Sequence, residues 1–269
     1  MRAPSRSSLI RRCELIALLA RKEWHIRYRS AKLGYAWAVL QPFMLMAVLL
    51  VMFGYVVPLD RQRYPETNPY PIFLLSGLFP WHFTSVAFSS ATPSFPNSRK
   101  LILLASFPRD VLPLGVVAAH LVNLLLTLPL LVPLYVYYWS APSWWVLALP
   151  VPIILQTVIV GGLSLIAALA CVRFTDTFFL VQALLLPWFY ATPIFYPRVA
   201  AGKLAGWLWL NPLTGVIELY RQCLMPVWPA ASEGHLGASL LAAGLWATVL
   251  TAFSAWLLRR SEATIADWI

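Results

Sequence analysis

Long apolar windows separated by short charged segments run along the whole chain. No charged residue lies between Lys32 and Asp60. Within that stretch, Leu33 to Val57 is long enough to cross about 30 Å of hydrocarbon at about 1.5 Å per residue. Pro71–Ser94, Thr177–Pro197 and Leu236–Leu258 are further apolar windows. The pattern is typical of a helical protein that crosses the membrane several times.

Two apolar regions need a finer division. The charge-free run from Val111 to Val172 is interrupted by turn formers and tryptophans between Trp139 and Trp145, which predicts a hairpin of two spans. Val199 to Val227 is apolar but is broken by polar and helix-breaking residues, so we expect a re-entrant or interfacial pair of short helices there. The sequence therefore predicts an all-α membrane protein with six spans, the first kinked at Gln41-Pro42.

The N-terminal segment is amphipathic. Over residues 8–26 a helix would place Leu9, Cys13, Ile16, Ala20 and Trp24 on one face, and Arg11, Glu14, Arg21, Lys22 and His25 on the other. Leu18 falls on the polar side and Arg12 lies near the apolar edge. We predict a cytoplasmic interface segment over residues 1–32, followed by a six-span domain over residues 33–269. The alternative is a solvated helix packed on a partner.

The charge distribution predicts an orientation. Twenty Lys and Arg against ten Asp and Glu give a net charge of +10, while charged residues make up only 11% of the chain and hydrophobic residues 60%. That composition excludes an ordinary soluble enzyme. With both termini in the cytoplasm, fifteen of the basic residues lie inside and five outside. The positive charge is thus attributed to orientation and membrane lipids rather than to nucleic acid.

Enzymatic signatures are missing from the sequence. There is no G-x-x-x-x-G-K-[ST] loop, so an ATPase that powers transport would be a separate polypeptide. The four histidines and three cysteines show no spacing typical of a metal site. His82 and His120 fall in expected spans, where helix packing is the commoner role of a histidine. We expect no cofactor, no metal and no catalytic residue in this chain.

Some residues in apolar settings are candidates for a transport pathway. Glu218 and Arg221 share a helix face, either as a local ion pair or with Arg221 meeting an anionic group of the cargo. Trp81, Trp188 and Tyr190 lie well inside expected spans. Their rings could stack on sugar rings or simply pack between helices, and the sequence leaves both interpretations open.

Six segments in order resemble one family along almost the whole chain. Arg27-Tyr28, Leu33-Gly34, Trp37 and Gln41-Pro42 are similar to the R-Y-x-x-x-x-L-G-x-x-W and Q-P pattern of ABC-2 type permeases that export polysaccharides and teichoic acids. The other segments are Phe107-Pro108-Arg109-Asp110, Val172-Arg173-Phe174-Thr175-Asp176, Thr192-Pro193-Ile194-Phe195-Tyr196-Pro197, Asn211-Pro212-Leu213-Thr214 with Tyr220-Arg221, and the tail Glu262–Ile269.

The resemblance implies roles for particular residues. It implies a homodimer in the bacterial cytoplasmic membrane, with two copies of a cytoplasmic ATPase that holds ATP and Mg²⁺. The cargo would be a lipid-linked glycan or polyol phosphate, moving along a channel between the permeases. The ATPase-coupling residues would be Arg11, Glu14, Arg99, Lys100, Arg109, Asp110, Arg173 and Asp176. Channel residues would be Gln41, Trp81, Trp188, Tyr190, Phe195, Tyr196 and Arg221, while Arg27, Arg29 and Lys32 would gather the phosphate of the lipid carrier.

Three alternatives compete with this hypothesis. A small-molecule exporter of the wider ABC-2 group is disfavoured by the polysaccharide-type motifs. A membrane-embedded transferase would need paired carboxylates or a nucleophile with its base, and no convincing spacing offers them. An ATP-independent carrier would lose support if an ATPase copurified with the chain.

Overall fold

The computed structural model describes residues 6–29, 32–52, 67–104, 108–139, 144–225 and 235–261. All regular elements within these ranges are helices, as the apolar windows predict. In chain order they are α1 (Arg6–Arg29), η1 (Gly34–Ala36), α2 (Trp37–Val51), α3 (Tyr70–Ala91), α4 (Ser94–Asn97), α5 (Arg99–Leu104), α6 (Val111–Thr127), η4 (Leu128–Leu131), α7 (Val132–Trp139), η5 (Trp144–Ala148), α8 (Pro150–Arg173), α9 (Thr177–Ala191), η6 (Arg198–Leu204), η7 (Trp207–Leu210), α10 (Thr214–Leu224) and α12 (His235–Ser261).

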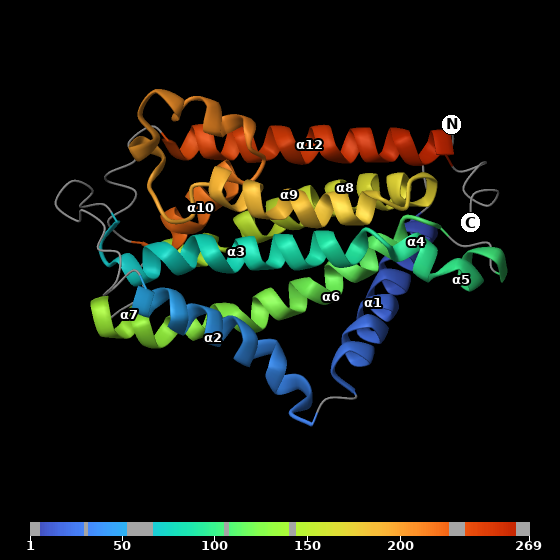
Figure 1. Cartoon of the computed structure of the whole chain (residues 1–269), viewed down its shortest axis with the longest axis horizontal. Helices are drawn as coiled ribbons and strands as arrows, with labels where there is room; N and C mark the ends of the chain where they lie inside the picture. Colours follow the sequence, from blue (N-terminus) through green and yellow to red (C-terminus); the bar gives the residue numbers. More distant parts are fainter. Residues whose placement is uncertain are drawn as a thin grey trace.

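Four stretches of the described chain are long and apolar enough to cross a membrane. They are Tyr70–Ala91, Val111–Tyr138, Trp144–Arg173 and Leu236–Ser261. They match the second, third, fourth and sixth predicted spans, and Figure 1 shows α3, α6, α8 and α12 running along the long axis of the molecule. The described residues therefore support a multi-pass membrane protein.

Of the two other predicted spans, the fifth is shorter than expected and the first is described only in part. Helix α9 ends at Ala191 rather than continuing to Pro197, because Pro193 disfavours the helical conformation at Thr192, whose backbone is extended. At 15 residues it is about 22 Å long, less than the hydrocarbon thickness. Helix α2 continues through Pro42 and is described as far as Val51, while residues 53–57 of the predicted first span lie outside the described residues. The full count of six spans thus exceeds what the described helices provide.

Helix α1 packs against α6 through one side only. Ile16, Ala20 and Trp24 are half-buried as predicted, and Tyr28 continues this side as a buried residue. Cys13, expected on the same face, is instead exposed, so the prediction is wrong at this position. A Cβ atom on Gly115 would come within 2.8 Å of Leu19 Cβ, so the two backbones lie very close. The axes of 10–29 and 34–48 then differ by 101°, and the corner stands away from the bundle (Figure 1).

The main core surrounds α3, most of whose residues are buried. Gln156 of α8 donates hydrogen bonds to Pro80 O at 2.7 Å and to Thr84 Oγ1 at 2.9 Å. Its amide oxygen accepts a bond of 2.8 Å from the Tyr220 hydroxyl. Because a buried amide is costly unless its donors and acceptor are used, this arrangement fixes the register of α3, α8 and α10.

Glycines bring α12 against its neighbours. A Cβ on Gly162 of α8 would meet Leu250 Cβ at 3.0 Å, and one on Gly215 of α10 would meet Ser239 O at 2.7 Å. Small residues allow helix backbones to approach closely in membranes, where packing replaces the hydrophobic effect. Helices α8, α10 and α12 consequently form one tightly packed unit.

A second, smaller core lies at the end of the bundle where α6 begins and α8 and α12 end. It contains Phe95, Ile102, Leu112, Leu165, Ala168 and Leu169, with Leu19, Val172, Leu257 and Leu258 packed around it. The first turn of α1 and the last turn of α12 lie at this same end (Figure 1). We call it the basic end, because Arg99, Lys100, Arg109, Arg173, Arg259 and Arg260 gather there.

Candidate functional site

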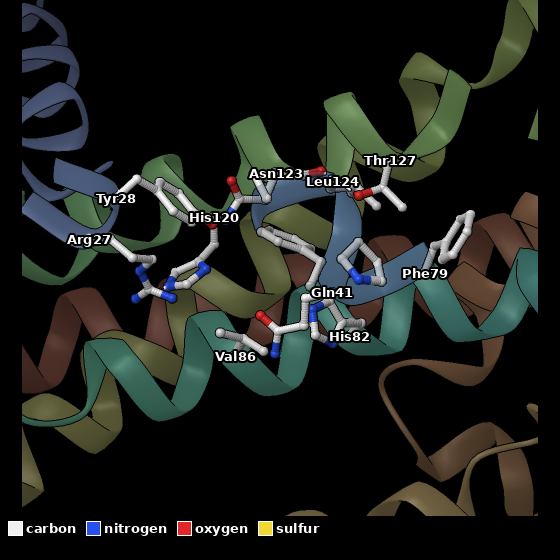
Figure 2. A pocket seen from close by; sticks show the side chains of 13 residues that line it. Arg27, Tyr28, Gln41, Phe79, His82, Val86, His120, Asn123, Leu124 and Thr127 are labelled. Atoms are coloured by element: carbon white, nitrogen blue, oxygen red, sulfur yellow. Dashed lines mark hydrogen bonds between the residues drawn. The ribbon is translucent and has the colours of Figure 1, made fainter. Parts of the chain in front are cut away.

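A polar recess lies between α1 and α2 on one side and α3 and α6 on the other (Figure 2). Arg27 and His120 stand side by side at one end of it, and Gln41 and His82 lie near its middle. Polar side chains facing a cavity among apolar helices are the default indication of a functional site in a membrane protein. The lining consists of Arg27, Tyr28, Ala38, Gln41, Pro42, Phe79, His82, Phe83, Val86, His120, Asn123, Leu124 and Thr127.

Arg27 has two polar side-chain contacts, and neither is with a carboxylate. One of its guanidinium nitrogens, Nη2, lies 2.9 Å from His120 Nε2 and 3.3 Å from Ser90 Oγ. Both contacts use the same nitrogen, and the residue as a whole is exposed. A guanidinium can donate two parallel hydrogen bonds to a phosphate or carboxylate. Arg27 is therefore placed to bind an anion without losing a buried ion pair.

The recess continues into a larger cavity of about 370 Å³. Arg27, His120 and Asn123 line both spaces, and the larger one extends to Ser89 and Asn97 at the basic end. Asn123 is held by the Trp24 indole, which donates to its Oδ1 at 2.8 Å. The sequence predicts Arg27 at the cytoplasmic surface and Gln41 within the first span, and the structure brings both into one recess with the two histidines and Asn123.

Arg29 and Lys32, the other predicted phosphate ligands, are exposed at the outer corner between α1 and α2. Neither lines the recess or the larger cavity. They flank the site from outside, so the structure brings only Arg27 of this predicted trio into the cavity.

Most predicted coupling residues are exposed. Arg11 and Glu14 project from α1, Arg99 and Lys100 lie on α5, and Arg173 and Asp176 border the turn between α8 and α9. Arg109 is half-buried. Asp110 precedes α6 and forms an ion pair of 3.4 Å with Arg12, so it already has a partner within the chain. The predicted coupling segment Asn97–Phe107 is described up to Leu104.

The predicted channel aromatics fall into two groups. Trp81 is buried, with its ring centroid 5.6 Å from Trp188 and 5.4 Å from Phe189. Trp188 also donates its indole N–H to Asn211 Oδ1 at 3.0 Å. Tyr190 is exposed, while the half-buried Phe195 and Tyr196 lie beside it. The first group packs between helices, whereas Tyr190 is accessible.

Arg221 is completely buried. Its Nη2 donates hydrogen bonds to Pro193 O at 2.6 Å and Ile194 O at 3.0 Å, and its Nη1 lies 3.5 Å from Glu218 Oε1. The guanidinium carbon also lies 3.8 Å from the centre of the Phe73 ring. In this conformation cargo cannot reach the side chain. The placement favours the ion-pair interpretation, with Arg221 tying α10 to the segment after α9.

The sequence does not predict that His82 and His120, on two different helices, line the same recess. His82 and His120 were weighed singly, and 38 residues of chain separate the two positions, so spacing alone could not bring them together. A weak indication was available on α6, where His120, Asn123 and Thr127 follow one another at helical intervals. The Arg12–Asp110 pair carried no sequence signal.

The chain is similar to transport proteins of one kind over most of its length. The ABC-2 type transporter family matches residues 14–225. The O-antigen export system permease protein RfbA of Myxococcus xanthus is 33% identical over 210 residues, which cover 77% of this chain and 78% of that protein. An RfbA of Klebsiella pneumoniae is 30% identical over 214 residues, or 79% and 80% of the two chains. The polysialic acid transport protein KpsM of Escherichia coli is 27% identical over 220 residues, or 79% and 81%.

Proposed function

This chain belongs to the ABC-2 type transporter family, and from that premise we propose that it is the membrane permease subunit of an ATP-driven polysaccharide exporter. One observation carries the proposal: permeases for O-antigen and for polysialic acid align with 77% and 79% of its length. Those relatives favour a polysaccharide exporter over a small-molecule exporter. They also favour a transport subunit over a membrane-embedded enzyme.

The cargo is a glycan carried on a lipid phosphate, rather than a polyol phosphate. The named relatives export O-antigen or transport polysialic acid, which favours a sugar polymer. A polymer of this kind needs a passage with weak, repeated contacts. Exposed aromatic faces such as that of Tyr190 can provide such contacts without holding the chain in place.

Arg27 receives the lipid phosphate. Its guanidinium lies at the mouth of a polar recess that opens beside the α1–α2 corner, with His120 and Asn123 as neighbours. Because Arg29 and Lys32 are exposed outside that mouth, they attract the anion electrostatically before Arg27 binds it.

Two copies of the chain enclose the channel. Helices α2 and α9 expose large apolar side chains, among them Met44, Val48, Phe179, Leu184 and Tyr190. A second copy would cover part of this surface. The 15-residue length of α9 is compatible with this arrangement, because a short helix is better accommodated beside protein than alone in lipid.

A separate ATPase, with its ATP and Mg²⁺, binds the basic end. The short helix α5 presents Arg99 and Lys100 to solvent on a core that includes Ile102. Acidic residues on the ATPase would complement these charges. The positive charge at this end supports a cytoplasmic location for it and for both termini.

Depletion of the chain in its own host tests the function. We expect lipid-linked glycan to accumulate inside the cell while the surface polymer is lost, and the composition of the accumulated glycan identifies the cargo. Re-expression of the unaltered chain is the control and restores both pools. Normal levels of both pools, in a host without a second copy of the system, would contradict polysaccharide export.

A further inference from the structure

A groove of about 650 Å³ lies on another face of the molecule, between α6, α8 and α12. It is separate from the recess at Arg27, and the two share no lining residue. The residues that line it are Arg12, Asp110, Leu114, Thr157, Val158, Gly161, Gly162, Leu165, Thr251, Ser254, Ala255, Leu258 and Arg259.

The inner part of the groove is effectively apolar. Gly161, Gly162 and Ala255 add little bulk to the walls of the groove, and Leu165 and Leu258 line it with methyl groups. Two of its hydroxyls bond within their own helices: Thr157 donates to Ile153 O at 2.7 Å and Ser254 to Thr251 O at 3.0 Å. Such satisfied hydroxyls present little polarity to a ligand, so the space suits a hydrocarbon chain.

The mouth of the groove is charged and positive. Arg12, Asp110 and Arg259 line it at the basic end, two guanidiniums against one carboxylate. Arg12 pairs with Asp110 at 3.4 Å, while 47% of the Arg12 side chain is still exposed. Arg259 is exposed at the last turn of α12. An anionic group would complete the charge balance at this point.

We infer that this groove binds an anionic phospholipid of the adjacent leaflet, with one acyl chain between α8 and α12 and its phosphate between Arg12 and Arg259. Basic pockets between membrane helices on the cytoplasmic side commonly recognise such headgroups. The lipid would join α1, through Arg12, to the last turn of α12. This inference concerns a face away from the proposed cargo site and does not depend on the cargo.

Photolabelling of the full-length chain in vesicles tests the inference. The vesicles contain phosphatidylcholine doped with phosphatidylglycerol that carries a photoreactive group at the end of one acyl chain. Because the photoreactive group lies at the far end of the acyl chain, we expect labelled peptides to contain Thr157, Val158 or Thr251, with several times less label from phosphatidylcholine carrying the same group. Equal labelling by the two lipids would overturn the inference.

Three variants separate the headgroup from the fold. Arg259→Gln should lower phosphatidylglycerol labelling about five-fold, the factor that corresponds to one basic residue near the surface. The matched control is Arg260→Gln, which removes the same charge from the next residue, outside the groove, and should lower labelling clearly less than Arg259→Gln does. Ala255→Leu keeps both arginines but fills the groove, and should also lower labelling. If labelling survives Arg259→Gln, or if the groove peptides cross-link to another protein chain, the groove does not hold this lipid.

Discussion

Two arginines in largely apolar surroundings, Arg27 and Arg221, have opposite environments. Arg221 is completely buried, and its guanidinium contacts two carbonyls, a carboxylate and an aromatic ring. Arg27 is exposed and uses one nitrogen for a histidine and a serine at the edge of a cavity. A guanidinium near apolar helices therefore has a structural role when its N–H groups already contact protein acceptors, as in Arg221. It is available to bind a ligand when several of its N–H groups are without such contacts, as in Arg27.

The largest effect is expected at Arg221. Replacing it with Met leaves Glu218 buried without its cation and two carbonyls without their donor. Breaking a buried pair in this way costs about 3–5 kcal/mol. We expect loss of folded protein, measured as the monodisperse fraction after heating in detergent. Lys203→Gln is the control, since it removes an exposed charge from the preceding segment. If the Arg221→Met protein is stable but does not support export, Arg221 acts in transport and not in folding.

Substitution of Arg27 should reduce export without reducing the stability of the protein. In Arg27→Gln we expect the amount of folded protein to persist and export to fall by about tenfold or more, because a charge-assisted bond to phosphate is lost. Arg27→Lys should recover only part of the export, since an ammonium cannot bind bidentately. Arg21→Gln, an exposed position on the same helix, is the matched control. Export and folded protein falling together in Arg27→Gln would make this residue structural too.

Trp188 and Tyr190 allow the same distinction between a structural and a ligand-binding side chain to be tested with uncharged residues. Trp188→Ala removes ring contacts with Trp81 and the bond to Asn211, so we expect about 2 kcal/mol of lost stability. Tyr190→Ala changes an exposed ring and should reduce export several-fold, with stability shifted by less than about 0.5 kcal/mol. Melting temperature and surface polymer are the two measurements. If the amount of exported polymer per folded protein is the same in both variants, Tyr190 has only a packing role, like Trp188.

The smallest effect is expected at the basic end. Charge reversal at Arg99 and Lys100 should weaken ATPase association up to about five-fold for each residue, because exposed ion pairs are worth about 1 kcal/mol or less. Copurification of the ATPase at increasing salt concentration measures the effect. Reversal of Lys203 controls for total charge. An unchanged complex with unchanged transport would remove α5 from the coupling role.

The periodic features of the fold were predictable from the sequence. Apolar windows predicted α3, α8 and α12, and helical spacing predicted the half-buried side of α1 at Ile16, Ala20 and Trp24. The early end of α9 was not predicted, because apolar content alone does not show that Pro193 stops the helix. Periodicity depends on local structure, so it predicts the position of a helix and its buried side but not the contacts between helices.

The site was predictable only in part. Arg27 and Gln41 were proposed from a resemblance in order and spacing, and both line the recess. Their neighbours His82 and His120 come from two different helices, and only tertiary packing brings them together. Arg221 shows the reverse case, since its spacing from Glu218 predicted an ion pair but gave no measure of burial.

The close approach of α12 to α8 and α10 at Gly162 and Gly215 has a mechanical consequence. With no room for even a methyl group at Gly215, these helices cannot slide or separate without breaking backbone contacts. We therefore expect any displacement during transport to involve α2 and α9, whose side chains are exposed, rather than a separation of α8, α10 and α12.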